Sequence, residues 1–280
     1  MANTSGHASS GGAEIGLPVD AHVHFYHLRL VEPTLDAALG NLRRVARRAH
    51  GLIGVLLLTQ ARFEHVFEEL ESLTSIGDWT LRSAAHEAQT LIARRDGAEL
   101  AIVCGRQIRA EAGLEVLALG TQHTFPEDRP LAATIDAVHD SGALAVLPWG
   151  FGKWLGRRGV LVRATLTSEG RDRLFLGDNG GRLALAPTPA IVRGFEQLGF
   201  RVLPGTDPFP FGGDFRRVGA FGFLADVADP GDASWSCLRE WLIRSPVSPR
   251  RFGDACRPAR FVFNQIGIQI YNRLAGGVPA

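Results

Sequence analysis

The sequence predicts an α/β protein whose mainly parallel strands close into a barrel. Apolar strand-like runs alternate with segments of helical periodicity, which is the order of parallel βαβ units. The run LIGVLLLT, at 52–59, is apolar throughout, as expected of a strand covered on both faces. Several apolar runs end in a polar residue or a glycine. In an α/β barrel such strand ends meet at one mouth, which carries the reacting groups.

The expected elements follow one another along the chain. A strand at 16–25 and a helix at 32–51 precede the strand at 52–59, and a second helix follows at 61–73. Between 79 and 120 we expect strands joined by short turns, with a hairpin at RDGAE, 95–99. Later helices are expected at 130–142, 186–199 and 232–245, and strand-and-loop segments at 143–159, 174–182 and 200–214. We therefore divide the chain into a flexible tail at 1–16, a barrel domain at 17–244 and a C-terminal extension at 245–280.

Composition excludes several classes of protein. The 30 basic and 29 acidic residues leave a net charge of +1, so no basic field favours nucleic acid or an anionic membrane. No apolar run approaches the roughly 20 residues of a membrane span, and we expect the small, polar start to be a loose tail and not a signal peptide. Three scattered cysteines form no CxxC pair, which favours a reduced, cytoplasmic protein. The expected partner is a small-molecule substrate, possibly an anion.

The segment DAHVH, at 20–24, is the best candidate for a metal site. Residues i and i+2 of a strand share a face, so Asp20, His22 and His24 are expected to align at the barrel mouth. Two imidazoles can clamp one divalent ion, and Asp207, at the end of a late strand, is the best third ligand. The expected ion is zinc, manganese or iron. The alternative is that both histidines only form hydrogen bonds at a strand end, and His27 is expected in the loop beyond.

The sequence resembles the polymerase-and-histidinol-phosphatase (PHP) family and, more loosely, the amidohydrolases. Matching segments run in order over most of residues 17–225: DAHVH, VLLLTQARF, IVCGRQI with LEVLALG, AVHDSGALAVLPWGF, and LPGTDPF. The resemblance implies a distorted, TIM-like barrel that hydrolyses phosphoesters with a cluster of two or three metals.

The sequence departs from that pattern at most of the implied ligand positions. Gln60 and Ala61 stand where the family has Asp and His, and Gln107 replaces the bridging glutamate. Pro148 with Trp149, and Pro208 with Phe209, replace further His-containing pairs. A neutral amide cannot hold two like-charged ions together. Since only His22, His24 and Asp207 keep ligand chemistry, we expect one ion at most. The amidohydrolase pattern fails similarly, because no histidine follows His139.

A loop at 148–159, PWGFGKWLGRRG, is a candidate lid over the site. It carries two tryptophans, Trp149 and Trp154, and Lys153, the chain's only lysine. Flat aromatic walls and the charges of Lys153 and Arg157 suit an anionic or aromatic substrate. Lys153 can act as an electrophile, a proton donor or a carboxylated ligand, or supply simple charge. The alternative is a surface loop anchored by buried tryptophans.

Four further residues are candidates for the rim of the site. Asp178 can be a fourth ligand or a general base, and Arg182 and His123 can bind substrate, as can Gln107. Asp-Asn-Gly is also ordinary turn chemistry, and a lone rim histidine is often simply solvated.

These residues lead to two hypotheses. The first is a divergent PHP-like, single-metal hydrolase of a phosphoester, ester or amide, with Asp178 as base and Lys153 and Arg157 holding charge. The second is a catalytically inactive PHP-like domain that binds a ligand or partner. A two-histidine, one-carboxylate iron site for oxygen chemistry is a distant third.

Overall fold

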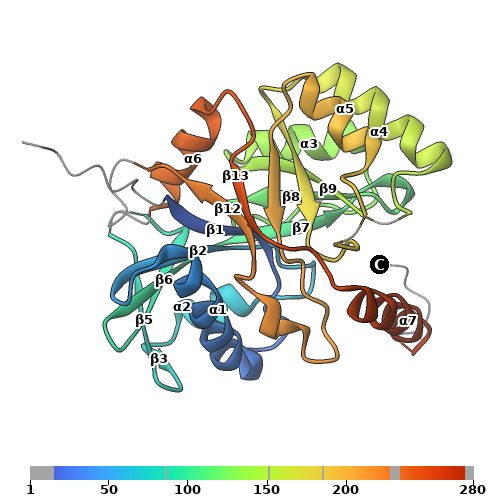
Figure 1. The fold of residues 1–280 in the computed structure, drawn as a ribbon. Helices are drawn as coiled ribbons and strands as arrows, with labels where there is room; N and C mark the ends of the chain where they lie inside the picture. The colour runs from blue at the N-terminus through green and yellow to red at the C-terminus, as the bar shows by residue number, and fades with distance from the viewer. Residues whose placement is uncertain (1–15, 86, 151, 185, 228–233, 275–280) are drawn as a thin grey trace, which may run out of the picture.

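The computed structural model of the 280-residue chain describes residues 16–85, 87–150, 152–184, 186–227 and 234–274 (Figure 1). The predicted tail lies outside the described residues except for Gly16. Across the described part of the chain, no helix is both long and apolar enough to cross a bilayer.

The first sheet, called sheet A, has eight strands in the order β13-β12-β1-β2-β6-β5-β4-β3. Its central strands β1, β2 and β6 are parallel, and every other neighbouring pair is antiparallel. The strands are β1 (Leu17–Val23), β2 (Gly51–Leu58), β3 (Ser75–Ile76), β4 (Trp79–Ser83), β5 (Thr90–Arg95), β6 (Ala98–Val103), β12 (Phe221–Ala225) and β13 (Arg250–Gly253).

The second sheet, called sheet B, has five strands in the order β11-β10-β9-β8-β7. Strands β9, β10 and β11 are parallel, whereas β7 and β8 run antiparallel to their neighbours. The strands are β7 (Gly105–Arg109), β8 (Glu115–Leu119), β9 (Leu144–Trp149), β10 (Leu174–Asn179) and β11 (Val202–Gly205).

The α/β class is confirmed, but the predicted barrel is wrong, because both sheets are open among the described residues. Parallel neighbours need a crossover of a dozen or more residues, and the strands between 75 and 119 are joined by connections too short for one. The predicted hairpin is an example. Asp96 and Gly97 have φ of 49° and 74° between β5 and β6, which are the left-handed positions of a tight hairpin turn.

Helices cover the outer face of each sheet (Figure 1). Sheet A is covered by α1 (Val31–Ala46) and α2 (Val66–Glu71), and sheet B by α3 (Leu131–Asp140), α4 (Gly156–Glu169) and α5 (Ala190–Gln197). Helix α6 (Trp235–Arg244) adds buried side chains to the core between the sheets. Short 3-10 turns lie at Leu28–Leu30, Glu111–Gly113 and Asp214–Arg217. The predicted extension, 245–280, supplies β13 and the last helix, α7 (Pro258–Leu274), and its boundary stays a prediction.

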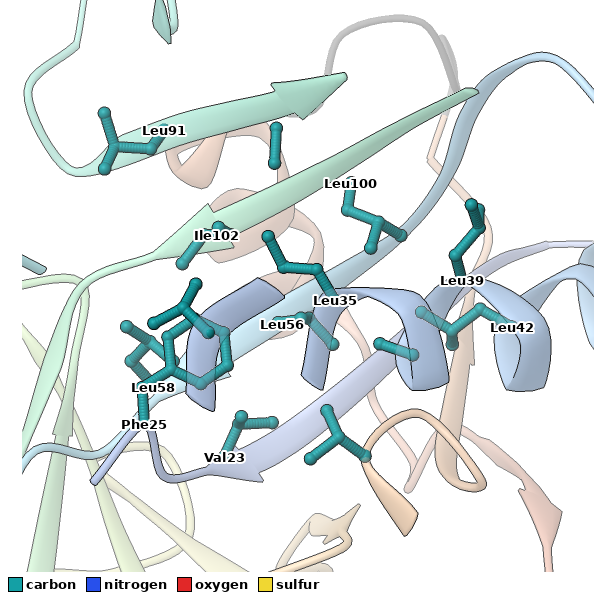
Figure 2. Packing of buried hydrophobic residues seen from close by; sticks show 14 of the residues in the cluster. Val23, Phe25, Leu35, Leu39, Leu42, Leu56, Leu58, Leu91, Leu100 and Ile102 are labelled. Carbon is teal, nitrogen blue, oxygen red and sulfur yellow. The ribbon is translucent and has the colours of Figure 1, made fainter. Parts of the chain in front are cut away.

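Three apolar cores hold these layers together. Figure 2 shows the first, where Leu35, Leu39 and Leu42 of α1 pack on sheet A. These spacings of three and four residues place one helix face on the sheet. The second core fills the space between the sheets, and the third lies under α3, α4 and α5. Because the sheets pack face to face, the ends of β1 and β11 are held close together.

Two glycines let the sheets approach at that end. A Cβ on Gly205 of β11 would lie 2.3 Å from the backbone nitrogen of His22, and one on Gly105 of β7 would lie 2.2 Å from the carbonyl oxygen of Leu58. Backbone hydrogen bonds join the sheets here, from Asp207 N to His22 O at 2.8 Å and from Gln60 N to Gly105 O at 3.1 Å. A side chain at either glycine would push the sheets apart.

Candidate metal centre

His22, His24 and Asp207 meet where β1 and β11 end. The Nε2 atoms of the two histidines lie 3.2 Å apart, and Asp207 Oδ1 lies 3.4 Å from His22 Nε2 and 3.6 Å from His24 Nε2. Both rings are buried, whereas the Asp207 side chain is 26% exposed. The cluster is therefore enclosed on the histidine side and open to solvent on the carboxylate side.

The backbone places these ligands for local reasons. Thr206, the residue that follows β11, is tied to β1 by Asp20, whose carboxylate accepts from Thr206 N at 2.8 Å and from Thr206 Oγ1 at 2.6 Å. Asp20 also accepts from Gly219 N at 2.8 Å and from the backbone nitrogen of His22 at 3.3 Å, so it joins backbone segments and contacts no histidine ring nitrogen in these bonds. Burial raises the pKa of Asp20 to about 6, although these hydrogen bonds oppose the shift. Asp207 follows with φ 45°, a left-handed conformation that Asp tolerates better than most residues.

Asn179 orients both His22 and Asp207. Its Nδ2 donates to Asp207 Oδ2 at 2.7 Å, and its Oδ1 lies 3.2 Å from His22 Nδ1. A carboxylate only accepts, so the amide oxygen must face His22, and His22 Nδ1 must carry the proton. In a neutral ring the lone pair is then on Nε2, the atom that faces the cluster. This is the arrangement that a metal-binding histidine requires.

Glu64 lies against the other histidine. Its Oε2 is 3.7 Å from His24 Nδ1, too long for a hydrogen bond but close enough for an ionic contact. His24 Nδ1 is buried without a hydrogen-bond partner, and Glu64 is held by the backbone nitrogen of Ala61 at 2.9 Å. A small movement of either side chain would complete the pair. Tyr26 stacks on the His24 ring, with centroids 5.2 Å apart.

The charges around the two rings differ. Burial lowers the pKa of His22 below its ordinary value, and the nearby charge of Asp207 offsets only part of this effect. Burial also opposes charging of His24, but Glu64 and Asp207 outweigh it and raise the pKa of His24. Burial is likewise outweighed at Glu64, whose pKa is lowered by His24 and the Ala61 amide. His24 is therefore the ring that takes up a proton first.

Three of the four atoms that face one another are acceptors, and the fourth, His24 Nε2, is an acceptor whenever that ring is neutral with its proton on Nδ1. His22 Nε2 meets His24 Nε2, Asp207 Oδ1 and, at 3.1 Å, Gln107 Oε1. Lone pairs gathered in this way repel unless a proton or a cation lies among them. A tetrahedral ion with bonds of about 2.0–2.1 Å holds neighbouring ligand atoms about 3.3–3.4 Å apart. The three separations of 3.2, 3.4 and 3.6 Å fit that spacing, so His22, His24 and Asp207 can hold a metal ion.

Asp178 and Arg182 pair with each other. Arg182 Nε donates to Asp178 Oδ1 at 2.6 Å and Nη2 donates to Oδ2 at 3.1 Å, and both side chains are buried. Successive residues of a strand point to opposite faces, so Asp178 turns away from the cluster that its neighbour Asn179 contacts. Their roles as base and substrate ligand stay predictions.

The predicted lid is shorter than expected, because α4 begins inside it at Gly156. Trp154 is buried in the core under α4, and Trp149 packs against the same core. Lys153 forms an ion pair with Glu115 of β8, whose charge opposes part of the lowering of the His22 pKa and adds to the raised pKa of His24. Lys153 thus lies on the cluster side of sheet B. Arg157 is exposed on the first turn of α4, and Phe151 lies outside the described residues.

His123 is exposed and contacts Phe125 edge-on, with ring centroids 4.9 Å apart. Of the predicted substrate ligands, only Gln107 reaches the cluster directly. Sequence reasoning missed Glu64, Glu115 and the role of Asn179. Strand alternation could have identified Asn179, because Asp178 and Asn179 cannot share a face. Glu64 carries no comparable signal, since it lies outside regular structure and precedes α2.

Comparison with known proteins gives a fold relative but no family. The solved structure of PsfC from Pseudomonas syringae PB-5123 is similar over 91% of this chain and 98% of its own, with a TM-score of 0.54 and 14% identity. At this identity the likeness shows a shared fold alone. The lesion-specific endonuclease EndoQ from Pyrococcus furiosus matches 80% of this chain and 55% of its own, with a TM-score of 0.44 and 12% identity.

No protein-family model matches the chain, and no curated protein does. The predicted membership of the PHP family is therefore wrong, and so is the looser assignment to the amidohydrolases. The open sheets also lack the closed barrel that the resemblance implied. The quoted segments match short strand-and-loop patterns, and such patterns recur wherever parallel strands end at a site.

Proposed function

We propose that this protein is a metal-dependent hydrolase that uses one divalent ion, held by His22, His24 and Asp207, to cleave a phosphoester, an ester or an amide. The observation that supports it best is the meeting of three ligand atoms at 3.2 to 3.6 Å, a tetrahedral spacing, with the carboxylate side open to solvent. Catalytic zinc sites typically have three protein ligands and one open position.

A bound ion would lower the pKa of a water molecule towards neutrality and polarise a substrate oxygen. The protein's own part is to keep the ligands in the right state. Asn179 accepts a hydrogen bond from His22 Nδ1 and so keeps the proton of that ring on Nδ1. Glu64 is placed to accept a hydrogen bond from His24 Nδ1 after a small movement. Such outer partners orient the rings and make them better ligands. The separations between the ligand atoms favour zinc. Manganese and iron are tested beside it.

The proton-accepting group is proposed to be Glu115. Asp178 was the sequence-based candidate, but Arg182 engages both of its carboxylate oxygens. Glu115 is 11% exposed and acts electrostatically on both histidines. Lys153, its ion-pair partner, would hold the developing negative charge, and Arg157 would meet an anionic substrate from solvent.

Metal content and hydrolysis test the proposal together. Protein purified without added metal is analysed for zinc, manganese and iron, then stripped, reloaded with each and assayed on p-nitrophenyl phosphate, acetate and anilide. We expect about one ion per chain, lost in His22→Ala and retained in the matched control His65→Ala, whose side chain is 53% exposed. Bound metal without hydrolysis of any substrate would refute the enzyme, and no bound metal would refute the site.

A binding module that does not catalyse is the second candidate. The observation that favours it is that Asp178 and Lys153, the side chains expected to move protons, are both in ion pairs. Glu115→Gln separates the two candidates. In a hydrolase this variant lowers kcat strongly and leaves metal affinity nearly unchanged. In a binding module the wild type already shows no turnover, and the variant changes nothing.

A further inference from the structure

We infer that the substrate carries an uncharged aromatic or compact branched apolar group, which binds in a pocket that adjoins the metal centre. The inference rests on the proposed function for the position of the reacting bond, but the pocket can be tested separately. The pocket has a volume of about 190 Å³ and shares His24 with the metal centre. Pro208, which follows Asp207 directly, also lines it.

Five Phe and Tyr side chains form much of the pocket wall. They are Phe25, Tyr26, Phe209, Phe211 and Phe215. Phe209 and Phe211 stack with ring centroids 5.3 Å apart, so the loop between β11 and β12 presents a preformed surface. Aromatic faces of this kind favour offset or edge-on packing with another ring.

Apart from those of His24, which belongs to the metal centre, the polar side chains of the lining are already engaged within the protein. Tyr26 OH donates to the carbonyl oxygen of Pro208 at 2.7 Å, and Thr34 Oγ1 donates to that of Leu30 at 2.6 Å. Asp214 is fully buried and accepts from Phe209 N at 2.9 Å and from Arg260 Nε at 3.0 Å. A charged group placed here would lose its hydration and gain no counter-ion, so the lining favours an uncharged group.

The volume limits the size of that group. An apolar cavity of about 150 Å³ is large enough to bind benzene, whereas drug-sized ligands need about 300 Å³ or more. At about 190 Å³ the pocket accepts one ring or a branched aliphatic group. The pocket beside Gln107, at about 30 Å³, has room for little more than water. The apolar part of a substrate therefore fits on the His24 side.

Two probes separate the pocket from the metal. Zinc-loaded protein is titrated with benzohydroxamate and acetohydroxamate, which share the metal-binding group and differ in the apolar part. Metal-stripped protein is titrated with benzyl alcohol by NMR. We expect benzohydroxamate to bind about 10- to 100-fold more tightly than acetohydroxamate, the range that burial of one apolar side chain gives. We also expect benzyl alcohol to bind without metal.

A variant that fills the pocket completes the test. Leu30→Trp is expected to abolish benzyl alcohol binding and to remove the preference for benzohydroxamate, whereas the control Leu198→Trp, at an exposed site on the far side of sheet B, is not. If Leu30→Trp lowers the thermal midpoint, Pro210→Trp fills the pocket from the loop. Equal binding of the two hydroxamates, unchanged in the filled variants, overturns the inference. If the protein takes up no zinc when it is offered but still binds benzyl alcohol, the pocket is supported and only the proposed hydrolase is rejected.

Discussion

The side-chain oxygen of Asn179 lies 3.2 Å from Nδ1 of His22, the ring nitrogen that does not face the other ligands. The same amide donates to Asp207 Oδ2 at 2.7 Å, so one side chain from β10 orients two of the three candidate ligands. Side chains that hydrogen-bond to metal ligands in this way increase metal affinity measurably. The relationship therefore gives the first prediction.

Asn179→Ala is expected to weaken zinc binding by about 10- to 100-fold, because His22 loses its fixed tautomer and Asp207 its orientation. Competition with a chromophoric chelator measures the change. Asn41→Ala is the matched control, since Asn41 donates to the carbonyl oxygens of Arg216 and Val218 away from the site. Equal zinc affinity in Asn179→Ala and wild type would show that Asn179 does not orient the metal ligands.

Zinc affinity is expected to fall as the pH falls, with about one proton competing. The pKa of His24 is raised above its ordinary value of 6.5, so its protonation begins at a higher pH than usual, whereas the lowered pKa of His22 keeps that ring neutral. Metal needs both rings neutral. Glu64→Gln removes the charge that favours the His24 cation, so the loss of affinity should begin at a lower pH.

The measurement is the slope of log Kd against pH for wild type and Glu64→Gln between pH 5 and 8. At high pH the variant should bind zinc more weakly, since a neutral amide supports the ring less well than a carboxylate. Two curves of the same shape and position would exclude the assigned role of Glu64.

Gly205→Ala is expected to destabilise the fold and loosen the metal site. The added Cβ would lie 2.3 Å from the backbone nitrogen of His22, so β11 and β1 must separate. Overpacking of this kind costs about 1–3 kcal/mol. Gly40→Ala is the control, because Gly40 lies inside α1 with nothing within 4 Å of a Cβ, and alanine there should stabilise by about 0.5–1 kcal/mol. Urea unfolding measures the free energy of unfolding of both variants. An unchanged value for Gly205→Ala would show that the two sheets can accommodate a methyl group where they approach each other.

The alternation of strands and helices could be read from the sequence, because covered strands and amphipathic helices leave periodic patterns. Helix α1 was expected at 32–51 and lies at Val31–Ala46, and the hairpin at Asp96-Gly97 was expected from its turn residues. Whether the strands form a closed barrel or open sheets could not be predicted from the sequence. It depends on which strands pair, and the antiparallel insertion of β3 to β5 is decided by packing far along the chain.

The candidate site, like the fold, could be predicted from the sequence only in part. The meeting of His22, His24 and Asp207 was predicted from strand ends, since such ends converge in parallel folds. The partners that hold them were not predicted, because Asn179, Glu64 and Glu115 come from three separate segments. Asp178 was predicted to be a general base because it is an acidic residue at a strand end. In the structure it forms an ion pair with Arg182, four residues later.

Arg182→Met is expected to destabilise the protein by about 3–5 kcal/mol, the usual cost of leaving a buried charge unpaired. Zinc affinity should change little, because Asp178 faces away from the cluster. Arg173→Met is the control: Arg173 is 48% exposed where it pairs with Asp136, and such pairs contribute about 1 kcal/mol or less. Urea unfolding and zinc titration are measured on both. If Arg182→Met changed zinc affinity and not stability, the pair would belong to the site.

Arg260→Met is expected to weaken the aromatic pocket more than the metal centre. Arg260, on α7, donates to Asp214 Oδ1 at 3.0 and 2.9 Å and to the carbonyl oxygen of Gly212 at 2.8 Å. Asp214 in turn holds the backbone nitrogen of Phe209 in the pocket wall. Loss of the guanidinium leaves this buried carboxylate with Arg217 at 3.5 Å as its remaining cation among the described residues. The loop should therefore open locally.

Hydrogen exchange of residues 208–215 and the affinity for benzyl alcohol measure that opening. We expect faster exchange and weaker binding in Arg260→Met, with zinc affinity close to wild type because Asp207 is still held by Asn179 and by its bond to His22 O. Arg257→Met, at an exposed position just before α7, should leave both readouts unchanged. Since α7 reaches the pocket through this contact, equal exchange in the two variants would mean that the last helix does not support the substrate pocket.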